Sequence, residues 1–360
     1  MRNGWSGGQF SVFRVCLAVA TLIQLGSWSH PGEAASTLAL SLSSPWLFFA
    51  VILGAICLGL GWFARPAALL LIPFTALAPA NSPWETLHLS LLLAVFMLLP
   101  AGPYGSLKAR GRQDPNGDWA LPEWVRAGVW SLWTGLFLAL HSGIASGELA
   151  PDFLSKLFQP SGIPILLTLA GIPWCFRKKW QPLGWCLMAV AQILACLQGF
   201  GSGCFPSFLL LLLAANPGWL APKVTGSAEW MFYDGSCGLC HRACRFVLAE
   251  DRTGQLFRFA PLDGFTFNEE IPEDQRENLP DSVLILTQEG RLISESDAAI
   301  HICGRLGGLW RICARMSLLI PKPIRQNMYR FIARIRYKVF AKPSEACPVI
   351  PPKMRVRFGP

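Results

Sequence analysis

The sequence predicts an α-helical polytopic membrane domain of about eight spans, followed by a small α/β domain. Three observations support this prediction. The 360-residue chain is 52% hydrophobic and only 15% charged, whereas soluble domains average about 25% charged residues. Long apolar runs end near Leu220, and charged and turn residues return at ordinary frequency from about Glu229. A Cys-x-x-Cys pair, Cys237 and Cys240, opens the second part.

Eight apolar runs define the first domain, which we expect to cover residues 1–222. A linker at 223–229 then leads to the second domain at 230–360. The runs are 12–25, 46–63, 67–80, 87–99, 127–144, 163–175, 183–200 and 205–220. Several are shorter than the roughly 20 residues that an untilted transmembrane helix needs, so the count has a margin of about one span.

Basic residues alternate along the connections between these runs. With a cytoplasmic N-terminus, the inner segments carry Arg2, Arg65, Lys108, Arg110, Arg112, Arg126, Arg177, Lys178, Lys179 and Lys223. The outer segments carry only Lys156. The positive-inside rule therefore predicts a multi-pass protein of the cell (inner) membrane, with both termini in the cytoplasm. A second interpretation makes the first run a signal peptide cleaved near Glu33-Ala34-Ala35, which leaves the other spans as oriented.

Three ionisable side chains fall within the predicted spans: Arg14, His88 and His141. Such residues are costly in lipid and are functional candidates by default. For Arg14 the simpler interpretation is a side chain that snorkels to the interface. Each histidine is either functional or hydrogen-bonded to a neighbouring helix.

Cys196 and Cys204 stand at the outer ends of two consecutive predicted spans, joined by a short Gly-rich connection. Such a hairpin could bring them within the Cα separation of a disulfide, about 4.4–6.8 Å. An oxidisable outer pair would suit electron transfer between compartments, with Gln192, His88 and His141 lining a site for a quinone. The alternative is that both cysteines are ordinary apolar filler.

Three stretches of the first domain stand out: Phe13-Arg14, Leu60-Gly-Trp-Phe-Ala-Arg-Pro66 and Leu99-Pro-Ala-Gly-Pro-Tyr-Gly-Ser106. They resemble the membrane domain shared with vitamin-K-dependent gamma-carboxylase, the horizontally transferred transmembrane domain. The resemblance implies a shared helical fold. The carboxylase uses a lysine as its key base, and the corresponding stretch here, Trp133-Thr-Gly-Leu-Phe-Leu138, contains none. Carboxylase chemistry is therefore not expected.

The second domain has the expected order strand, helix, strand, then strand, strand, helix. The strands are predicted at 230–233, 256–260, 282–287 and 291–294, and the helices at 237–251 and 297–306. A long polar loop is expected between the second and third strands. This order is that of a thioredoxin-like fold.

The position of Cys237 gives the cysteine pair a chemical rationale. A thiol attacks as thiolate, and a helix N-terminus lowers the thiol pKa through unpaired N–H groups and the positive end of the helix dipole. With Ser236 as the expected N-cap, Cys237 is the predicted attacking thiol. Cys240, one turn later, then attacks the mixed disulfide formed at Cys237.

Neighbouring residues add to this candidate site. Asp234 is placed to take or relay a proton, and His241, Arg242 and Arg245 add positive charge. Pro280 precedes the predicted third strand, where a thioredoxin-like fold commonly places a cis-proline facing the thiols. A trans proline that merely starts the strand is the equal alternative.

The cysteine pair of the second domain lies in the motif Tyr233-Asp234-Gly-Ser-Cys237-Gly-Leu-Cys240. This motif resembles the signature of the DCC family of predicted thiol-disulfide oxidoreductases. Similar stretches are Asp281-Ser-Val-Leu-Ile285, Leu319-Ile-Pro-Lys-Pro323, Ala333-Arg-Ile-Arg-Tyr-Lys-Val-Phe340 and the tail from Cys347 to Phe358. The resemblance covers the chain from Trp230 almost to its end. It implies a thioredoxin-like fold and redox chemistry at the two cysteines.

Two other interpretations of the cysteines stay open. Cys244 could join Cys237 and Cys240, with His241, Cys303 or Cys347, in a tetrahedral zinc site. A second Cys-x-x-Cys, which would make a zinc site a strong prediction, is absent from the sequence. The pair could also be chemically idle. Our prediction assigns neither a metal nor a cofactor.

The C-terminal segment is strongly basic. From Lys322 to Pro360 it has ten lysines and arginines and one acid, Glu345. Nucleic acid is one possible partner, but anionic inner-leaflet lipid next to a membrane domain is the simpler one, so no nucleic acid is expected. Within this segment an apolar stripe at helical spacing is expected to pack on the core, with the charges turned to the membrane: Ile324, Met328, Phe331, Ile335 and Val339.

The main functional prediction is a membrane-tethered thiol-disulfide oxidoreductase with a cytoplasm-facing dithiol that acts on protein or small-molecule thiols and disulfides. In a reducing compartment the pair rests as a dithiol. One alternative is a membrane enzyme or carrier for a quinone-like molecule, with a regulatory second domain. Another is a thioredoxin-like adaptor whose thiols do nothing.

Overall fold

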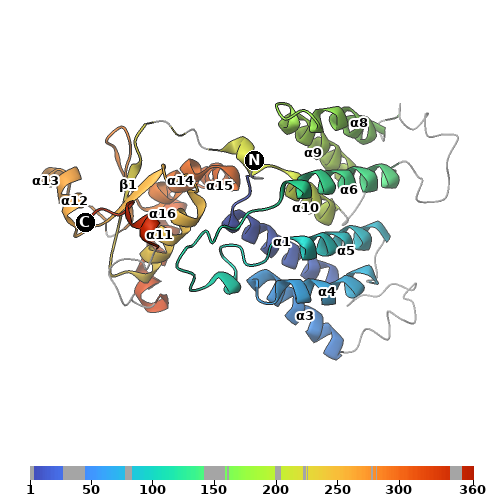
Figure 1. Ribbon diagram of the computed structural model, residues 1–360, viewed down its shortest axis with the longest axis horizontal. Coiled ribbons are helices and arrows are strands. Elements are labelled where there is room, and N and C mark those ends of the chain that lie inside the picture. Colours follow the sequence, from blue (N-terminus) through green and yellow to red (C-terminus); the bar gives the residue numbers. More distant parts are fainter. Residues whose placement is uncertain are drawn as a thin grey trace.

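The computed structural model describes residues 4–26, 45–77, 83–141, 159, 162–198, 204–221, 224, 226–276, 279–280, 282–340 and 351–360. In this part of the chain, the predicted apolar runs form eight α-helices (Figure 1). They are α1 (Gly7–Gly26), α3 (Pro45–Leu60), α4 (Ala64–Ala76), α5 (Pro83–Leu98), α6 (Glu123–His141), α8 (Ile163–Cys175), α9 (Gln181–Leu197) and α10 (Cys204–Ala214). The predicted positions of these helices are confirmed within a few residues, except that α1, α5 and α6 begin about four or five residues early, α4 ends four early and α10 ends six early.

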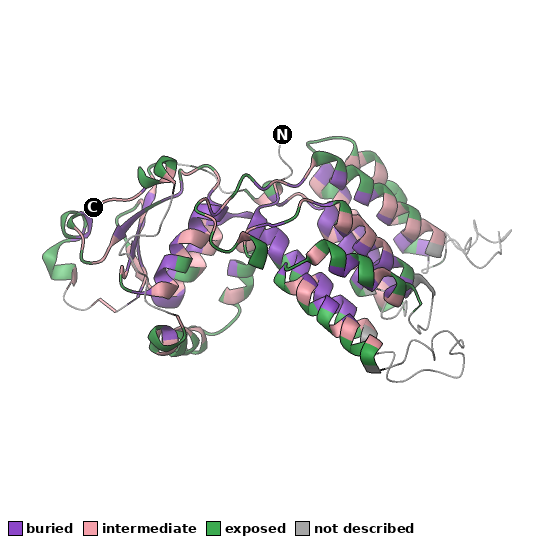
Figure 2. Cartoon of the chain, turned by 60° about the horizontal axis from the view of Figure 1, so that its bottom comes forward, coloured by how far each residue is buried: buried purple, intermediate pink, exposed green. Residues whose placement is uncertain are grey.

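An aromatic cluster at the start of α1 forms the centre of this helical bundle. Trp5 and Phe13 meet edge to face with ring centroids 6.0 Å apart, and Phe10 stacks on Phe96 of α5 at 5.9 Å. Phe10 also contacts Trp119, at 4.9 Å, in the connection between α5 and α6. The buried residues follow the inner faces of the helices (Figure 2).

Helix length gives limited support to the predicted spans. Among the described helices, one, over Gly7–Gln24, is long and apolar enough to cross a membrane, and 61% of that window is buried inside the protein. Six other apolar helices have 10–17 residues. The expected eight spans are therefore not supported by helix length.

The second part contains a four-stranded mixed sheet in the order β2-β1-β3-β4. The strands are β1 (Glu229–Tyr233), β2 (Phe257–Pro261), β3 (Leu284–Leu286) and β4 (Leu292–Ser294). β1 runs parallel to β2 and antiparallel to β3, and β3 is antiparallel to β4. Helix α11 (Gly238–Glu250) connects β1 to β2, and α14 (Glu295–Leu306) follows β4. The predicted order of strands and helices is confirmed.

The two faces of the sheet are covered differently. Met231, Phe259 and Ile285 point to the face that packs on α11 and α14. On the opposite face, Phe232 packs edge to face on Phe267 of α12 (Phe265–Glu270), with ring centroids 5.1 Å apart. The expected long polar loop is therefore wrong, because it contains α12 and a second short helix, α13 (Glu273–Arg276).

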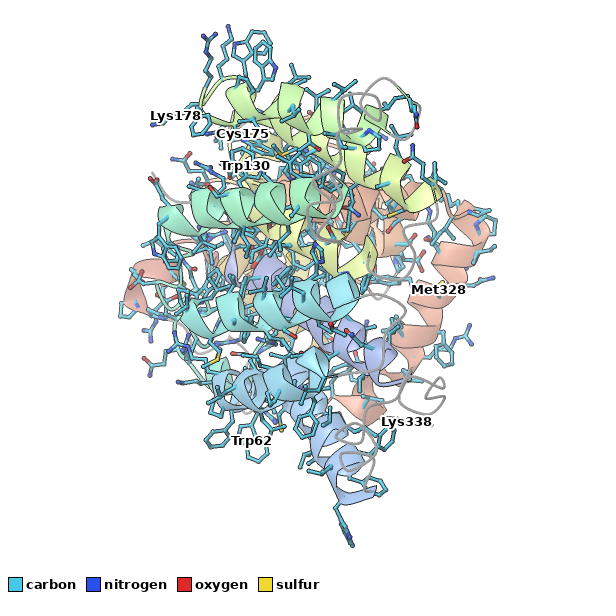
Figure 3. All side chains as sticks on the ribbon, turned by 90° about the vertical axis from the view of Figure 1, so that its right-hand side faces the viewer. Trp62, Trp130, Cys175, Lys178, Met328 and Lys338 are labelled. Carbon is cyan, nitrogen blue, oxygen red and sulfur yellow. The ribbon has the colours of Figure 1, made fainter. Side chains whose placement is uncertain are left out.

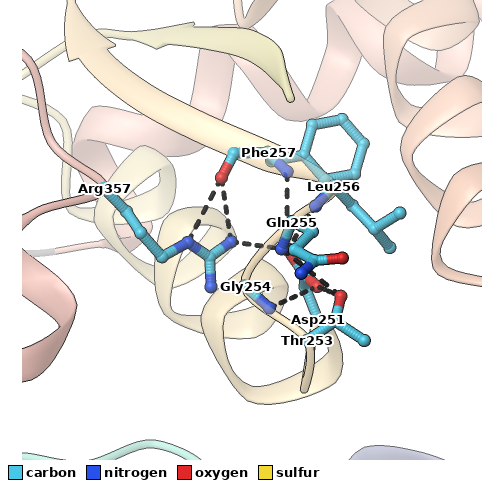
Figure 4. Close-up of polar contacts among 7 residues, drawn as sticks. All are labelled: Asp251, Thr253, Gly254, Gln255, Leu256, Phe257 and Arg357. Atoms are coloured by element: carbon cyan, nitrogen blue, oxygen red, sulfur yellow. Dashed lines mark hydrogen bonds and ion pairs between the residues drawn. The ribbon is translucent and has the colours of Figure 1, made fainter. Parts of the chain in front are cut away.

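The chain end is fixed to the outer edge of the sheet by a buried ion pair (Figure 4). The Arg357 guanidinium donates to Asp251 Oδ2 at 2.7 Å and to the Phe257 carbonyl. Asp251 also accepts hydrogen bonds from the backbone N–H groups of Gly254 and Leu256, each at 3.0 Å. Phe259 and the residues beside Phe358 exchange backbone hydrogen bonds, which extends the sheet beyond β2.

Two further helices follow the sheet: α15 (Gly308–Leu318) and α16 (Lys322–Val339). The expected packing of the apolar stripe of α16 is wrong. Ile324, Met328, Phe331 and Val339 are exposed and Ile335 is half-buried, whereas Arg336 is buried on the inward face. The reason is that acids on other elements face α16. Asp297 pairs with Arg325 at 2.8 Å and Glu295 with Arg330 at 2.9 Å.

The two parts of the chain meet at the start of α1 and the end of α11. The Glu250 carboxylate accepts hydrogen bonds from the Ser6 hydroxyl, the Gly8 backbone N–H at 2.9 Å and the Trp310 indole N–H. Nearby, Arg252 donates to the carbonyls of Trp5 and Trp119. The sheet and its helices thus lie at one end of the bundle (Figure 1).

Candidate redox site

Cys237 and Cys240 lie at the junction of β1 and α11. Cys237 is the N-cap of α11, and its Sγ accepts a hydrogen bond from the Cys240 backbone N–H at 3.4 Å. The expected N-cap, Ser236, is wrong by one residue. Its backbone N–H and hydroxyl instead donate to Asp234 Oδ1, each at 2.8 Å. The sulfur of Cys237 therefore occupies the capping position that a hydroxyl oxygen was expected to take.

Both thiols are buried and unbonded to another cysteine. Cys237 is 0% and Cys240 4% exposed. A cavity of ≈ 160 Å³ lies beside Cys240, between α11, α14 and α16. Its α16 wall is made by Tyr329, Ile332, Ala333 and Arg336. Helix α16 therefore forms one wall of the cavity beside Cys240.

Asp234 fastens α16 to the loop that carries the cysteines. Its Oδ2 accepts a hydrogen bond from the Tyr337 hydroxyl at 2.6 Å and lies 3.5 Å from Nη2 of Arg336. Burial by itself raises the pKa of Asp234, but the hydrogen bonds from Tyr337 and Ser236 and the charge of Arg336 outweigh it and leave the pKa below its ordinary value. The carboxylate is thus held in its charged form against α16.

The environment of Cys240 favours its protonated form. Burial raises the pKa of the Cys240 thiol to about 12, and the hydrogen bond and charge of the neighbouring Cys237 act in the same direction. A thiol with so high a pKa is a poor first nucleophile at neutral pH. Cys240 is therefore unsuited to make the first attack on a disulfide.

Two other predicted site residues, Tyr233 and His241, lie next to the cysteines. His241 is buried on α11, and its Nε2 is 2.9 Å from the Gly235 carbonyl oxygen. Tyr233 packs edge to face on His241, with ring centroids 5.9 Å apart. There is no cis peptide bond among the described residues, so Pro280 follows the trans interpretation, and its carbonyl accepts a hydrogen bond from the Ser282 N–H at 2.7 Å.

The geometry also bears on a metal site. Cys244 is buried on α11, in the same apolar cluster as Cys237 and Cys240. No group of three His, Cys, Asp or Glu side chains within the described ranges could hold a metal ion. Cys347, one of the residues considered for zinc, lies outside those ranges.

Candidates in the bundle are placed as follows. His88 is buried on α5. Gln192 on α9 accepts a hydrogen bond from the Ser207 hydroxyl at 2.8 Å and donates to Cys196 Sγ at 3.6 Å. Cys196 is disulfide-bonded. The side chain of Cys204 lies outside the described residues, so the Cys196–Cys204 pairing stays a prediction.

Four other residues of the sequence prediction also lie outside the described part of the chain: the His141 side chain, Arg2, Lys156 and Lys223.

Arg14 corrects another expectation. It is 1% exposed and donates to the carbonyls of Gly59 and Gly105, so it does not snorkel to an interface.

Sequence reasoning also missed Tyr329, Arg336 and Tyr337 beside the cysteines. The signal was present, because Arg336 and Tyr337 lie in the Ala333–Phe340 stretch already noted for its family resemblance, but the stretch alone gave them no role.

Comparison with known proteins identifies this second part. Residues 231–342 match the family described as DCC1-like thiol-disulfide oxidoreductase. The "Uncharacterized protein YuxK" of Bacillus subtilis (strain 168) is 32% identical over 130 residues, which are 36% of this chain and 93% of YuxK. No solved structure matches the chain significantly. Through its C-terminal part, the chain therefore belongs to the DCC1-like thiol-disulfide oxidoreductase family.

Proposed function

We propose that the protein is a membrane-tethered thiol-disulfide oxidoreductase whose dithiol, Cys237 and Cys240, faces the cytoplasm from a thioredoxin-like domain. The observation that carries this proposal is the position of Cys237. A sulfur that caps a helix receives backbone N–H groups and the positive end of the helix dipole, which stabilise a thiolate. The strand order and the helices on both faces of the sheet support a thioredoxin-like fold.

In the proposed reaction, the Cys237 thiolate attacks a substrate disulfide. A mixed disulfide forms, and the first substrate sulfur leaves as a thiolate that takes a proton from water. Cys240 then loses its proton and attacks Cys237 Sγ, and the second substrate sulfur leaves as a thiolate that takes up a proton. The substrate disulfide gains two electrons and two protons, and the dithiol becomes the Cys237–Cys240 disulfide.

Asp234 has a positioning role in this proposal. Its lowered pKa makes it a weak base, which disfavours the proton-relay role expected from the sequence. Its bonds to Tyr337 and Arg336 instead hold α16 over the dithiol. Substrate access then requires that the end of α16 moves away from Asp234.

We further propose that the helical bundle lies in the cell (inner) membrane with both chain termini in the cytoplasm. The α3–α4 turn, which Arg65 follows in the first turn of α4, and the α8–α9 turn, which carries Lys178, lie at the end of the bundle nearer the sheet (Figure 1). Basic cytoplasmic connections follow the positive-inside rule. The exposed apolar face of α16, flanked by Arg334 and Lys338, has the composition of a surface that lies on an anionic leaflet.

A redox titration of the full chain in detergent tests the dithiol assignment. Samples equilibrated in glutathione buffers are quenched with a maleimide and digested for mass spectrometry. We expect one two-electron transition that converts Cys237 and Cys240 to a disulfide. Cys240→Ser should instead accumulate a glutathione adduct at Cys237, because the second step is lost.

Cys313→Ser is the matched control, since Cys313 is an exposed thiol of the same domain. It should leave the transition unchanged. The proposal fails if Cys237 and Cys240 stay reduced at every potential, or if Cys237→Ser leaves disulfide reduction by the chain intact.

A further inference from the structure

We propose that a cavity in the helical bundle, distinct from the dithiol site, binds an amphiphile with an anionic head, either a carboxylate or a phosphate, on an apolar body. The cavity has a volume of ≈ 580 Å³ and lies between the first half of α1, the α3–α4 turn and the residues after α5. This volume is within the range of about 300–1,000 Å³ that is usual for small-molecule sites.

Arg14 forms the charged floor of this cavity. Its Nε and Nη2 donate to the Gly59 carbonyl at 3.3 and 3.2 Å, and Nη2 also donates to the Gly105 carbonyl at 3.2 Å. Nη1 has no hydrogen-bond partner among the described residues. A buried guanidinium without a counter-charge is costly, and an anionic ligand would relieve that cost.

The rim adds two more positive charges. Arg65 is held by the Leu99 carbonyl at 2.6 and 3.2 Å, and Lys108 is exposed beside it. None of the residues that line the cavity is acidic. Three cations without an acid give the cavity a positive potential, which selects an anionic ligand over a neutral quinone.

The rest of the wall is apolar. Phe10, Phe96 and Leu99 are buried in it, whereas Trp62 and Phe63 are exposed at its mouth. Trp62 lies at the outer edge of the bundle (Figure 3). An inorganic anion would satisfy the cations but leave this apolar surface uncovered, so an amphiphile fits better than phosphate alone.

Three segments that are far apart in the sequence line this one cavity. They are Arg14, the 60–66 turn and the 99–106 stretch. Gly61 has φ 71°, and a Cβ placed there would lie 2.6 Å from Arg14 Nη1 and 2.5 Å from Ser106 Cβ. Because glycine has no Cβ, the α3–α4 turn can lie close to the Arg14 guanidinium.

Native mass spectrometry of the detergent-solubilised full chain tests the proposal with dodecyl phosphate, dodecanol and inorganic phosphate as probes. We expect one dodecyl phosphate per chain, with dodecanol at least about tenfold weaker and inorganic phosphate unbound at the same concentration. Equal binding of alcohol and alkyl phosphate would overturn the anionic head. Binding of inorganic phosphate as tight as that of dodecyl phosphate would overturn the apolar body.

Variants separate this site from a general charge effect. Arg14→Gln should abolish selectivity for the phosphate, but it also removes two buried contacts and can impair folding. Lys108→Gln avoids this problem, because the side chain is exposed, and should weaken dodecyl phosphate about three- to tenfold. Arg110→Gln, two residues away and outside the cavity, is the matched control. The proposal is wrong if the Lys108 and Arg110 variants weaken binding equally.

Two sources of such a ligand are distinguished by competition in nanodiscs that contain phosphatidic acid. Loss of dodecyl phosphate binding supports the proposal with a membrane lipid as the ligand. Retained binding, still sensitive to Lys108→Gln, supports it with a free alkyl or acyl anion. Neither outcome depends on the dithiol, so failure here leaves the proposed redox function standing.

Discussion

Two buried arginines, one in each part of the chain, are surrounded in opposite ways. Arg357 in the C-terminal part has a carboxylate partner, Asp251, at 2.7 Å, and its guanidinium lies over the Phe259 ring at 5.1 Å. Arg14 in the bundle has only backbone carbonyls, and one nitrogen lacks a partner among the described residues. The paired Arg357 stabilises the fold of the C-terminal part, whereas the unpaired Arg14 lines a cavity. Counter-charge, and not burial, distinguishes a structural arginine from a candidate ligand site.

The largest expected effect tests the matched pair. Asp251→Asn leaves Arg357 buried without its counter-charge, so we expect a loss of about 3–5 kcal/mol in the free energy of unfolding of the C-terminal part. Urea denaturation followed by the fluorescence of that part measures it. Asp297→Asn is the control, since Asp297 pairs with Arg325 and Lys322 at a more exposed position and should cost about 1 kcal/mol or less. Similar losses in the two variants would show that the buried counter-charge of Arg357 has no special effect on stability.

A second prediction concerns a buried charge of the opposite sign, Glu250, at the boundary between the two parts. Burial raises its pKa above the ordinary value of 4.5, despite the hydrogen bonds from Ser6, Trp310 and Gly8. The folded state therefore binds this proton more tightly than the unfolded state does. The free energy of unfolding must then fall as pH rises from about 4.5 through the raised pKa, by at most about 1.4 kcal/mol per pH unit.

Glu250→Gln should flatten this decline, because the side chain no longer ionises. Denaturation midpoints measured from pH 4.5 upward would show it. Glu269→Gln, at an exposed carboxylate of the same part, should keep the wild-type slope. If all three proteins share one slope, Glu250 is not the group responsible.

The smallest expected effect concerns α16, whose contacts are partly exposed. Tyr337→Phe removes the hydrogen bond to Asp234 and should loosen the cover over the dithiol, so that Cys240 is alkylated about two- to fivefold faster. Maleimide labelling followed by mass spectrometry gives the rate. Phe331→Leu changes the outward face of the same helix and should leave the rate as it is. An unchanged rate in Tyr337→Phe would show that α16 is held elsewhere.

Local patterns predicted much of this fold. The apolar runs located the eight helices, and short hydrophobic segments with turn residues located the strands around Cys237 and Cys240. These signals lie within short continuous segments, so they can be recognised in a single sequence. The residues of the dithiol loop were likewise found from one continuous motif.

Other features depend on partners far apart in the sequence. The apolar stripe of α16 indicated burial, but acids at Glu295, Asp297 and Asp234 attract its polar face instead. The surroundings of Arg14 combine carbonyls from Gly59 and Gly105, which no local pattern reveals. Cys237 replaced Ser236 as the cap because the helix begins one residue later, at a boundary that propensity does not resolve.

Helix α11 connects the dithiol to the contact between the two parts of the chain. Its thirteen residues form a rod of about 20 Å, with the dithiol at its first turn and Glu250, in contact with α1, at its last. Thermodynamic reciprocity then applies to the pair of sites. If a ligand that moves α1 against Glu250 shifts the midpoint potential of the dithiol, the oxidation state must change the affinity for that ligand by the same free energy.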